Sequence, residues 1–170
     1  MSMNRTVTMG GNPMNLSGDG LGVGSKAPDF TLVGLDMKPK TLSDFSGKVC
    51  IISTVPSLDT GVCDTETRRF NVLAGELSDD IEILTVSVDL PFAQKRWCGA
   101  SGVDKVTMLS DHMTVDFGKN YGVLVTDLRI LARCVFVVDR EGVIRYTQLV
   151  PEIAQEPDYD PIIAAAKELL

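Results

Sequence analysis

The chain has 170 residues and a formal net charge of −7, and it is long enough to form one domain with a substantial hydrophobic core. Its acidic balance, with no basic run longer than Arg68-Arg69, argues against nucleic acid or an anionic membrane as a partner. The apolar runs have the length of strands, and none reaches the length of a membrane-spanning helix.

The N-terminal segment and the cysteines bear on the cellular compartment. Residues 1–24 contain one arginine and no apolar block typical of a signal peptide, so we expect a cytoplasmic protein. Four cysteines are too few for a disulfide scaffold in a chain of this length. In a reducing compartment, any pairing between them is more often catalytic than structural.

The chain begins with a predicted β-hairpin. Residues 5–9 and 14–16 flank a Gly-Gly-Asn-Pro turn, and residues 17–24 contain four glycines typical of a connector. We therefore interpret residues 1–24 as a hairpin and linker extension of a single domain that spans residues 1–170.

The centre of the chain predicts a parallel strand-helix-strand unit. Residues 49–55 form an apolar, largely β-branched run that stops at Pro56, which cannot donate a hydrogen bond to a sheet. A helix is predicted over residues 62–77 and a second apolar strand over residues 81–88. The interval between the strands suits a parallel crossover connection.

The other elements follow from the same kinds of pattern. Asp89 is expected to cap a helix that begins at Pro91, and the Arg140-Glu141-Gly142 turn predicts an antiparallel pair of strands around it. These patterns together predict an α/β protein with a mixed central sheet flanked by helices on both faces, a description that a thioredoxin-like fold satisfies. The predicted strands are 28–33, 106–109, 130–139 and 143–150, and the predicted helical segments are 41–45, 91–99, 114–121 and 160–170.

Cys63 is the first candidate for chemistry, because it lies in the first turn of the helix predicted after Pro56. Unpaired backbone N–H groups and the positive end of the helix dipole favour a thiolate there. The apolar spacing from Cys63 through Thr67 and Phe70 places the thiol on the face that the helix buries. Cys98 lies at the C-terminal end of the next long helix, where the dipole disfavours a thiolate, so the two thiols are predicted to differ in reactivity.

Arg133 interrupts the nearly continuous apolar run of residues 131–138. Burying an unpaired guanidinium group is very costly, so this side chain either points to solvent at the start of the strand or serves an anionic site such as a Cys63 thiolate. Cys50 and Cys134 lie within apolar strand sequences, and we predict that both are buried structural thiols.

Pro56, Thr60 and Cys63 form the pattern Pro-x-x-x-Thr-x-x-Cys, which resembles the active-site signature of the peroxiredoxins. The continuation over residues 64–71, together with Cys98 on the following helix, resembles the bacterial thiol peroxidase subfamily of atypical two-cysteine peroxiredoxins. This likeness extends over most of the chain and includes the N-terminal hairpin and Arg133.

The resemblance implies a peroxidase that reduces hydrogen peroxide and alkyl hydroperoxides without a metal or other cofactor. It implies that Cys63 is the peroxidatic nucleophile and that Cys98 resolves its sulfenic acid as an intrachain disulfide. Thr60 and Arg133 would position the peroxide, and Pro56 would shape the loop and shield the thiolate. The resemblance also implies thioredoxin as the reductant and a homodimer.

The implied disulfide and the implied homodimer each lead to a further expectation. A disulfide needs Cα atoms within about 7 Å, and two helices that cover a sheet usually hold their cysteines farther apart, so we expect the first turn near Cys63 to unwind during the cycle. The apolar loop residues that could cover a dimer interface are Leu58, Val123, Leu124, Val125 and Leu128.

Three alternative functions remain open at this point. A thioredoxin-like disulfide reductase would require Cys-x-x-Cys at the helix start, where this chain has Thr60. A peroxide sensor could use the same chemistry for signalling. A thiol-ligated metal-binding protein, with His112 as a further ligand, is disfavoured because the thiols are widely spaced and form no Cys-x-x-Cys pair.

Overall fold

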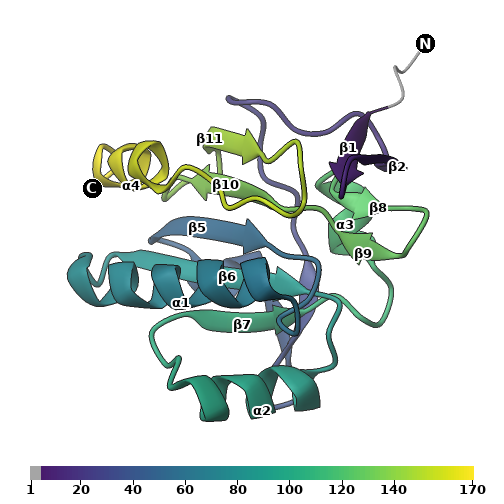
Figure 1. Ribbon diagram of the computed structural model, residues 1–170. Coiled ribbons are helices and arrows are strands. Elements are labelled where there is room, and N and C mark those ends of the chain that lie inside the picture. The colour runs from purple at the N-terminus through teal and green to yellow at the C-terminus, as the bar shows by residue number, and fades with distance from the viewer. Residues whose placement is uncertain (1–4) are drawn as a thin grey trace.

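The computed structural model describes residues 5–170, so the first four residues of the predicted extension lie outside the described part of the chain. At its centre is a seven-stranded mixed sheet with the strand order β11-β10-β5-β6-β7-β3-β4 (Figure 1). Strands β5, β6 and β7 are parallel, whereas β10, β11, β3 and β4 pair in antiparallel fashion. Their bounds are β3 Thr31–Gly34, β4 Pro39–Thr41, β5 Val49–Thr54, β6 Ile81–Ser87, β7 Thr107–Ser110, β10 Cys134–Val138 and β11 Ile144–Leu149.

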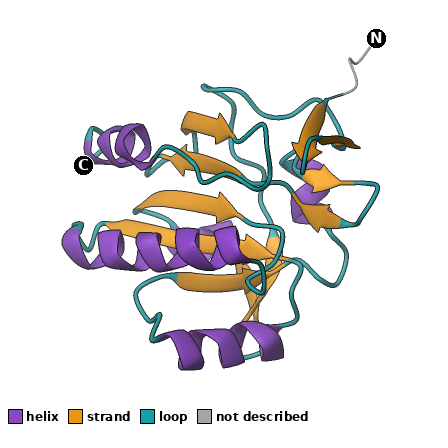
Figure 2. Ribbon diagram, viewed as in Figure 1, coloured by secondary structure: helices purple, strands orange, loops and turns teal. Residues whose placement is uncertain are grey.

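Helices cover both faces of this sheet, which confirms the predicted fold class (Figure 2). On one face, α1 (Gly61–Glu76), α2 (Pro91–Ser101) and α4 (Tyr159–Lys167) enclose an apolar core that includes Phe70 and Ile162. On the other face lie α3, a small second sheet and the N-terminal hairpin, which was also correctly predicted. The bounds on this side are α3 Asp116–Asn120, β8 Leu124–Val125, β9 Ile130–Leu131, β1 Thr6–Met9 and β2 Asn12–Asn15, and a 3₁₀ helix, η1, spans Leu42–Phe45.

Strand β5 is the central element, because all six of its residues are buried between β6 and β10. Such a strand must be apolar on both faces, which explains its continuous apolar sequence. It ends just before the buried Pro56, and α1 begins at Gly61, so the segment between them forms a loop at the carboxyl end of the sheet.

The single long strand predicted over residues 130–139 is wrong, because two separate strands occupy this range. Strand β9 pairs with β8 in the second sheet, and the central sheet receives only β10. The junction is held by tertiary hydrogen bonds, in which Ala132 N–H donates to the Val123 carbonyl (2.8 Å) and the Thr54 hydroxyl donates to the Ala132 carbonyl (2.7 Å). Arg133 therefore lies in the break between the two strands.

The predicted helix cap at Asp89 is also wrong. Leu90 is the N-cap of α2 and makes no side-chain capping bond. The Asp89 carboxylate instead accepts hydrogen bonds from the Ser57 hydroxyl (2.7 Å) and from the backbone N–H of Leu58 (2.9 Å). Asp89 thus holds the loop that leads into α1.

The residues suggested for a dimer interface are mostly part of the monomer's own core. Leu58, Val123, Leu124 and Val125 are buried, and of the five only Leu128 is exposed. Loop position alone did not reveal that the second sheet folds back against the hairpin and β10. Over residues 5–170, no helix combines the length and the apolar character needed to cross a membrane.

Candidate active site

Cys63 is the third residue of α1 and lies in its first turn, as predicted. The N-cap is Thr60, in an extended conformation, and its hydroxyl donates to the Ser57 carbonyl (2.8 Å) instead of capping the helix. Backbone N–H groups in this first turn have no intrahelical acceptor. The side chain of Cys63 has no exposed surface, and Phe70 is buried on the same helix face.

Arg133 contacts the Cys63 sulfur and does not reach solvent. Its guanidinium makes three hydrogen bonds: Nη2 donates to Cys63 Sγ (3.2 Å), Nη1 to Glu66 Oε2 (2.5 Å) and Nε to the Ile153 carbonyl (2.9 Å). Burial opposes the charged form of Arg133, but the Glu66 carboxylate and the Cys63 sulfur raise its pKa overall. The sequence left open whether Arg133 points to solvent or serves the Cys63 site, and the structure shows that it faces the Cys63 thiol.

Glu66 completes the buried ion pair and was missed in the sequence. It has no exposed surface, and its second carboxylate oxygen accepts a hydrogen bond from the Ser53 hydroxyl (2.8 Å). Burial raises the pKa of Glu66, while the ion pair with Arg133 works in the opposite direction. A usable signal was its spacing, because a residue three positions after Cys63 shares its helix face.

A small pocket opens beside the buried thiol. Its volume is about 230 Å³, and most of its walls are apolar. The pocket brings together three residues predicted from the sequence, Pro56, Thr60 and Arg133, next to the Cys63 position. The full lining is Met9, Pro56, Thr60, Gly61, Val62, Arg133, Ile153 and Ala154.

The N-terminal hairpin supplies one wall of this pocket through Met9. Backbone hydrogen bonds fix the hairpin to the loop after β11, from Thr8 N–H to the Pro151 carbonyl (2.8 Å) and from Ile153 N–H to the Thr8 carbonyl (2.8 Å). The Glu152 carboxylate also accepts from Gly11 N–H (2.8 Å). The sequence predicted the hairpin but not its contribution to the pocket.

Cys98 is near the end of α2, is partly buried and is not among the residues that line the pocket. Burial raises the pKa of its thiol, in the direction expected from its helix position. All four cysteines are free thiols. The structure therefore places Cys63 and Cys98 on neighbouring helices without joining them.

A polar bridge connects α1 to α2 close to both cysteines, and we call the Asp64, Arg68, Trp97 and Ser101 contacts the α1–α2 bridge. The Asp64 carboxylate accepts from Trp97 Nε1 (2.9 Å) and from Arg68 Nε (2.8 Å). Arg68 also donates to the Ser101 hydroxyl (3.1 Å), and its guanidinium lies 5.7 Å from the centre of the Trp97 ring. Arg68 thus contacts Asp64, Trp97 and Ser101, and within residues 5–170 it makes no hydrogen bond to Cys63.

The other two cysteines are buried, as predicted. Burial raises the pKa of both Cys50 and Cys134 to about 12, so neither is ionised near neutral pH. Among residues 5–170, no three or more His, Cys, Asp or Glu side chains come together as a metal site.

A thiol at a helix N-terminus, next to a buried guanidinium and a small pocket, is the arrangement of an enzyme with a cysteine nucleophile. On a thioredoxin-like fold, it defines a thiol-dependent redox enzyme. The sequence model of the Redoxin family matches residues 22–163.

Relatives narrow this class. The chain is 52% identical to a thiol peroxidase of Halalkalibacterium halodurans, covering 97% of this chain and 99% of that protein, and 50% identical to a thiol peroxidase of Bacillus subtilis, covering 96% and 98%. A crystal structure of a peroxiredoxin-like protein from Aquifex aeolicus superimposes with a TM-score of 0.92 at 44% identity, with both chains fully covered. The chain belongs to the bacterial thiol peroxidases of the peroxiredoxin family. It is therefore a peroxidase that acts on peroxide at the expense of a thiol reductant.

Proposed function

We propose that Cys63 is the peroxidatic residue, and the observation that carries this assignment is the 3.2 Å contact between Arg133 Nη2 and Cys63 Sγ. The thiolate attacks one oxygen of the peroxide, the O–O bond breaks, and the sulfur loses two electrons to become a sulfenic acid. The second oxygen leaves with a proton as water or as an alcohol. No metal or organic cofactor takes part in this step.

Stabilising the thiolate cannot by itself account for a peroxidase. For a generic thiol at neutral pH, lowering the pKa from about 8.5 to about 6 raises the thiolate fraction about 30-fold. Its nucleophilicity falls about 13-fold over the same range, so the net gain is only about twofold. Most of the rate enhancement must therefore come from groups that orient the peroxide and stabilise the charge on the departing oxygen.

Arg133, Thr60 and Pro56 supply these functions in our proposal. Arg133 is a fixed cation beside the sulfur, because Glu66 and the Ile153 carbonyl hold the other nitrogens of its guanidinium. Thr60 places a hydroxyl in the pocket wall and can accept a hydrogen bond from the peroxide. Pro56 forms apolar wall next to the thiol and limits the access of water.

We propose that Cys98 then attacks the Cys63 sulfenic acid, forming an intrachain disulfide and releasing water. Because the α1–α2 bridge ties the two helices together in the reduced state, some of its contacts must break as the first turn of α1 unwinds. A dithiol reductant restores both thiols by exchange, and we propose thioredoxin for this role on the basis of the family.

The pocket supports hydrogen peroxide and alkyl hydroperoxides as substrates. Its polar groups, Arg133 and Thr60, can bind the peroxide oxygens, and the side chains of Met9, Val62 and Ile153 can contact an alkyl group. A cytoplasmic location agrees with this cycle, because regeneration by a dithiol requires a compartment that keeps thiols reduced.

A homodimer is also part of the proposal. Leu90, Phe92 and Met113 are large exposed apolar residues, with exposed fractions of 52%, 68% and 70%. Leu90 and Phe92 lie at the start of α2, and Met113 lies in the loop after β7. The Ser110 hydroxyl donates to the Asp89 carbonyl and joins the end of β7 to the start of α2. This set replaces the mostly buried loop residues considered from the sequence.

The variant Cys98→Ser tests the two-cysteine cycle. Rapid-quench measurement should show an unchanged first turnover of peroxide, because Cys63 and its donors remain, whereas steady-state turnover with thioredoxin should be lost. Cys63→Ser should lose both activities, and Cys134→Ala, which changes a buried thiol outside the site, should keep both. Full steady-state turnover by Cys98→Ser would remove Cys98 from the mechanism.

A further inference from the structure

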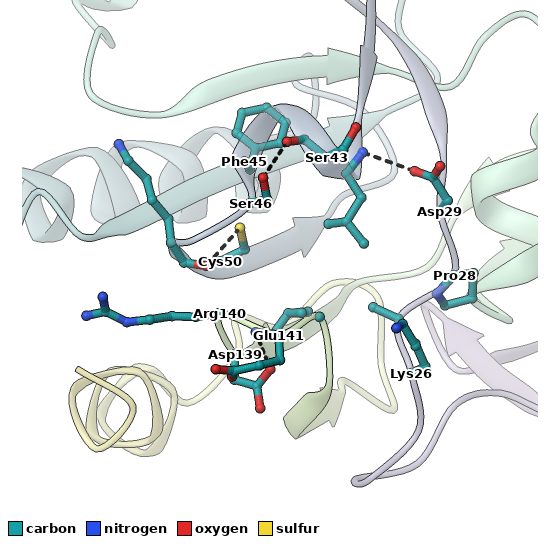
Figure 3. Close-up of a pocket in the computed structure, with 15 residues that line it drawn as sticks. Lys26, Pro28, Asp29, Ser43, Phe45, Ser46, Cys50, Asp139, Arg140 and Glu141 are labelled. Atoms are coloured by element: carbon teal, nitrogen blue, oxygen red, sulfur yellow. Dashed lines mark hydrogen bonds between the residues drawn. The ribbon is translucent and has the colours of Figure 1, made fainter.

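Cavities lie at both ends of β5, and the one at its carboxyl end adjoins Cys63. The larger cavity, about 530 Å³ in volume, lies beside the beginning of the strand (Figure 3). It is lined by equal numbers of basic and acidic side chains, namely Lys26, Lys48, Arg140, Asp29, Asp139 and Glu141. The smaller cavity, next to the thiol, is bounded in part by the N-terminal hairpin and the loop after β11. The contacts that hold these two segments therefore bear on the peroxide site.

The peptide group between Ile153 and Ala154 is the part of that loop that contacts Arg133. Its carbonyl oxygen accepts the hydrogen bond from Arg133 Nε (2.9 Å), and Ile153 is buried. Its N–H group, which belongs to Ala154, donates to Glu152 Oε2 (2.7 Å). Because a peptide group is planar, the acceptor that binds the N–H group also fixes the direction of the carbonyl. Glu152 thus orients the group that holds Arg133.

The other oxygen of the Glu152 carboxylate binds the N-terminal hairpin. Oε1 accepts from the backbone N–H of Gly11 (2.8 Å) and from the Thr8 hydroxyl (3.1 Å). The two segments also pair through their backbones, since Ile153 N–H donates to the Thr8 carbonyl (2.8 Å). One carboxylate therefore joins the hairpin to the loop after β11.

The charge of Glu152 contributes as well as its position. The N–H groups of Ala154 and Gly11 hold the pKa of its carboxyl below the usual range, so the group is ionised at neutral pH. Hydrogen bonds to an ionised acceptor are stronger than neutral ones, and hydrogen bonds in a chain polarise one another. A carboxylate on the N–H group therefore makes the Ile153 carbonyl a better acceptor for the positively charged Arg133.

We propose that Glu152 is a positioning residue for the peroxidase reaction: its carboxylate orients the Ile153–Ala154 peptide group and, through it, the Arg133 guanidinium. The assignment rests on the proposed function, in which Arg133 acts on the peroxide beside the Cys63 sulfur. Of the two contacts that fix the guanidinium there, the one at Nε would loosen without this carboxylate.

The variant Glu152→Ala tests this role in the full-length reduced protein. Stopped-flow oxidation should give a kcat/KM for hydrogen peroxide about tenfold below that of the parent, because a slightly misplaced catalytic group can cost up to about 100-fold. Glu141→Ala removes the same kind of side chain from the exposed turn between β10 and β11 and should keep the parent's rate. Glu152→Asp should retain at least about half of the rate, because an aspartate can accept the N–H bond from the residue two positions on.

Two further readouts separate positioning from a merely structural role. In heteronuclear NMR spectra, the Arg133 Nε–H signal should shift in Glu152→Ala, and its hydrogen exchange should become at least about fivefold faster, because its acceptor is less well ordered. In an Arg133→Lys background, Glu152→Ala should change kcat/KM by less than about twofold, because lysine has no Nε–H group for the Ile153 carbonyl to hold. A merely structural role would lower the thermal stability, leave the Arg133 signal in place and multiply the two losses of rate.

An unchanged kcat/KM in folded Glu152→Ala would overturn the proposal, and so would an unchanged Arg133 Nε–H signal or equal losses in Glu152→Ala and Glu152→Asp. If Glu152→Ala does not fold, Glu152→Gln, which keeps the length of the side chain but not its charge, takes its place and should lower kcat/KM at least about threefold. Full activity of Arg133→Lys would instead contradict the proposed role of Arg133, so the failure of either assignment can be recognised separately.

Discussion

At the scale of single residues, Arg133 places a buried positive charge beside the Cys63 sulfur. A buried guanidinium is tolerated here because Glu66, the Cys63 sulfur and a carbonyl occupy its three directions. Removing the arginine outright would leave Glu66 buried and unpaired, which typically destabilises a protein by about 3–5 kcal/mol. A substitution that keeps the positive charge at position 133 is therefore the better test of the role of Arg133 in catalysis.

Arg133→Lys keeps the charge but removes the planar fork, so a lysine cannot contact Glu66 and Cys63 in the same geometry. We expect kcat/KM for peroxide to fall about 100-fold, as when one donor to a transition-state charge is lost. Stopped-flow oxidation and thermal unfolding would measure rate and stability separately. Arg69→Lys, on the exposed face of the same helix as Cys63, is the matched control and should retain full activity; an active Arg133→Lys enzyme would contradict the assigned role.

Local rules of turns and caps were sufficient to place Pro56 at the end of a strand and Cys63 at the start of a helix. The site roles of Thr60 and Pro56 came instead from the resemblance to the peroxiredoxins, and Arg133 was marked by the charge that it introduces into an apolar run. Glu66 was missed because its spacing from Cys63, the one local signal, indicates the buried helix face but not the partner that a buried glutamate requires. Its burial depends on Arg133, which is 67 residues away in the sequence.

At the scale of elements, the α1–α2 bridge holds the helices that carry Cys63 and Cys98. Its central group, the Asp64 carboxylate, binds both Trp97 and Arg68. The bridge favours the closed arrangement, in which the peroxide site is assembled, over the open one that disulfide formation requires. Weakening it should therefore affect the resolving step and not the peroxide step.

Asp64→Asn keeps the shape of the side chain but leaves a single acceptor oxygen, so only one of the two donors, Trp97 Nε1 or Arg68 Nε, can still be bound, and the carboxylate charge is lost. We expect the disulfide to form about fivefold faster after oxidation, while the rate of peroxide reduction stays the same. Rapid quenching with a thiol-alkylating reagent, followed by mass spectrometry, would time both steps. Asp104→Asn, an exposed change just beyond α2, provides the control; an unchanged or slower resolving step in Asp64→Asn would refute the bridge's role.

Helices and strands were predictable where their burial produces a long, regular pattern of apolar residues in the sequence. Strands β5 and β6 and helix α1 show such patterns because each is long and largely buried on the faces that the pattern defines. Strands β4 and β8 have three and two residues and give no period to detect. The break before β10 depends on contacts with Val123 and Thr54, which are tertiary and not local.

At the scale of the whole molecule, the fold places two cavities at the two ends of its central strand. The catalytic pocket forms where the hairpin, the start of α1 and the loop after β11 meet, and the larger cavity forms at the other end. The remaining buried charge of note is Asp111, which lies between β7 and α3. Its carboxylate accepts N–H bonds from Phe117 and Gly118.

Asp111 should make the stability of the fold depend on pH. Burial raises its pKa from 3.8 to about 6, and the two backbone bonds offset this only in part. Because the folded pKa lies above the unfolded one, its favourable contribution is complete below about pH 4 and is lost as the pH rises through about 6. Urea unfolding of Asp111→Asn and the parent protein from pH 4 to 7 should show the parent losing stability relative to the variant; a constant difference would contradict the shift.

The most direct test of the account is the fate of the four thiols after reduced protein receives one equivalent of hydrogen peroxide. Peptide mapping by mass spectrometry should find one intrachain disulfide between Cys63 and Cys98, with Cys50 and Cys134 still free. A disulfide that involves either buried thiol, or consumption of the peroxide with Cys63 left reduced, would contradict the proposed cycle.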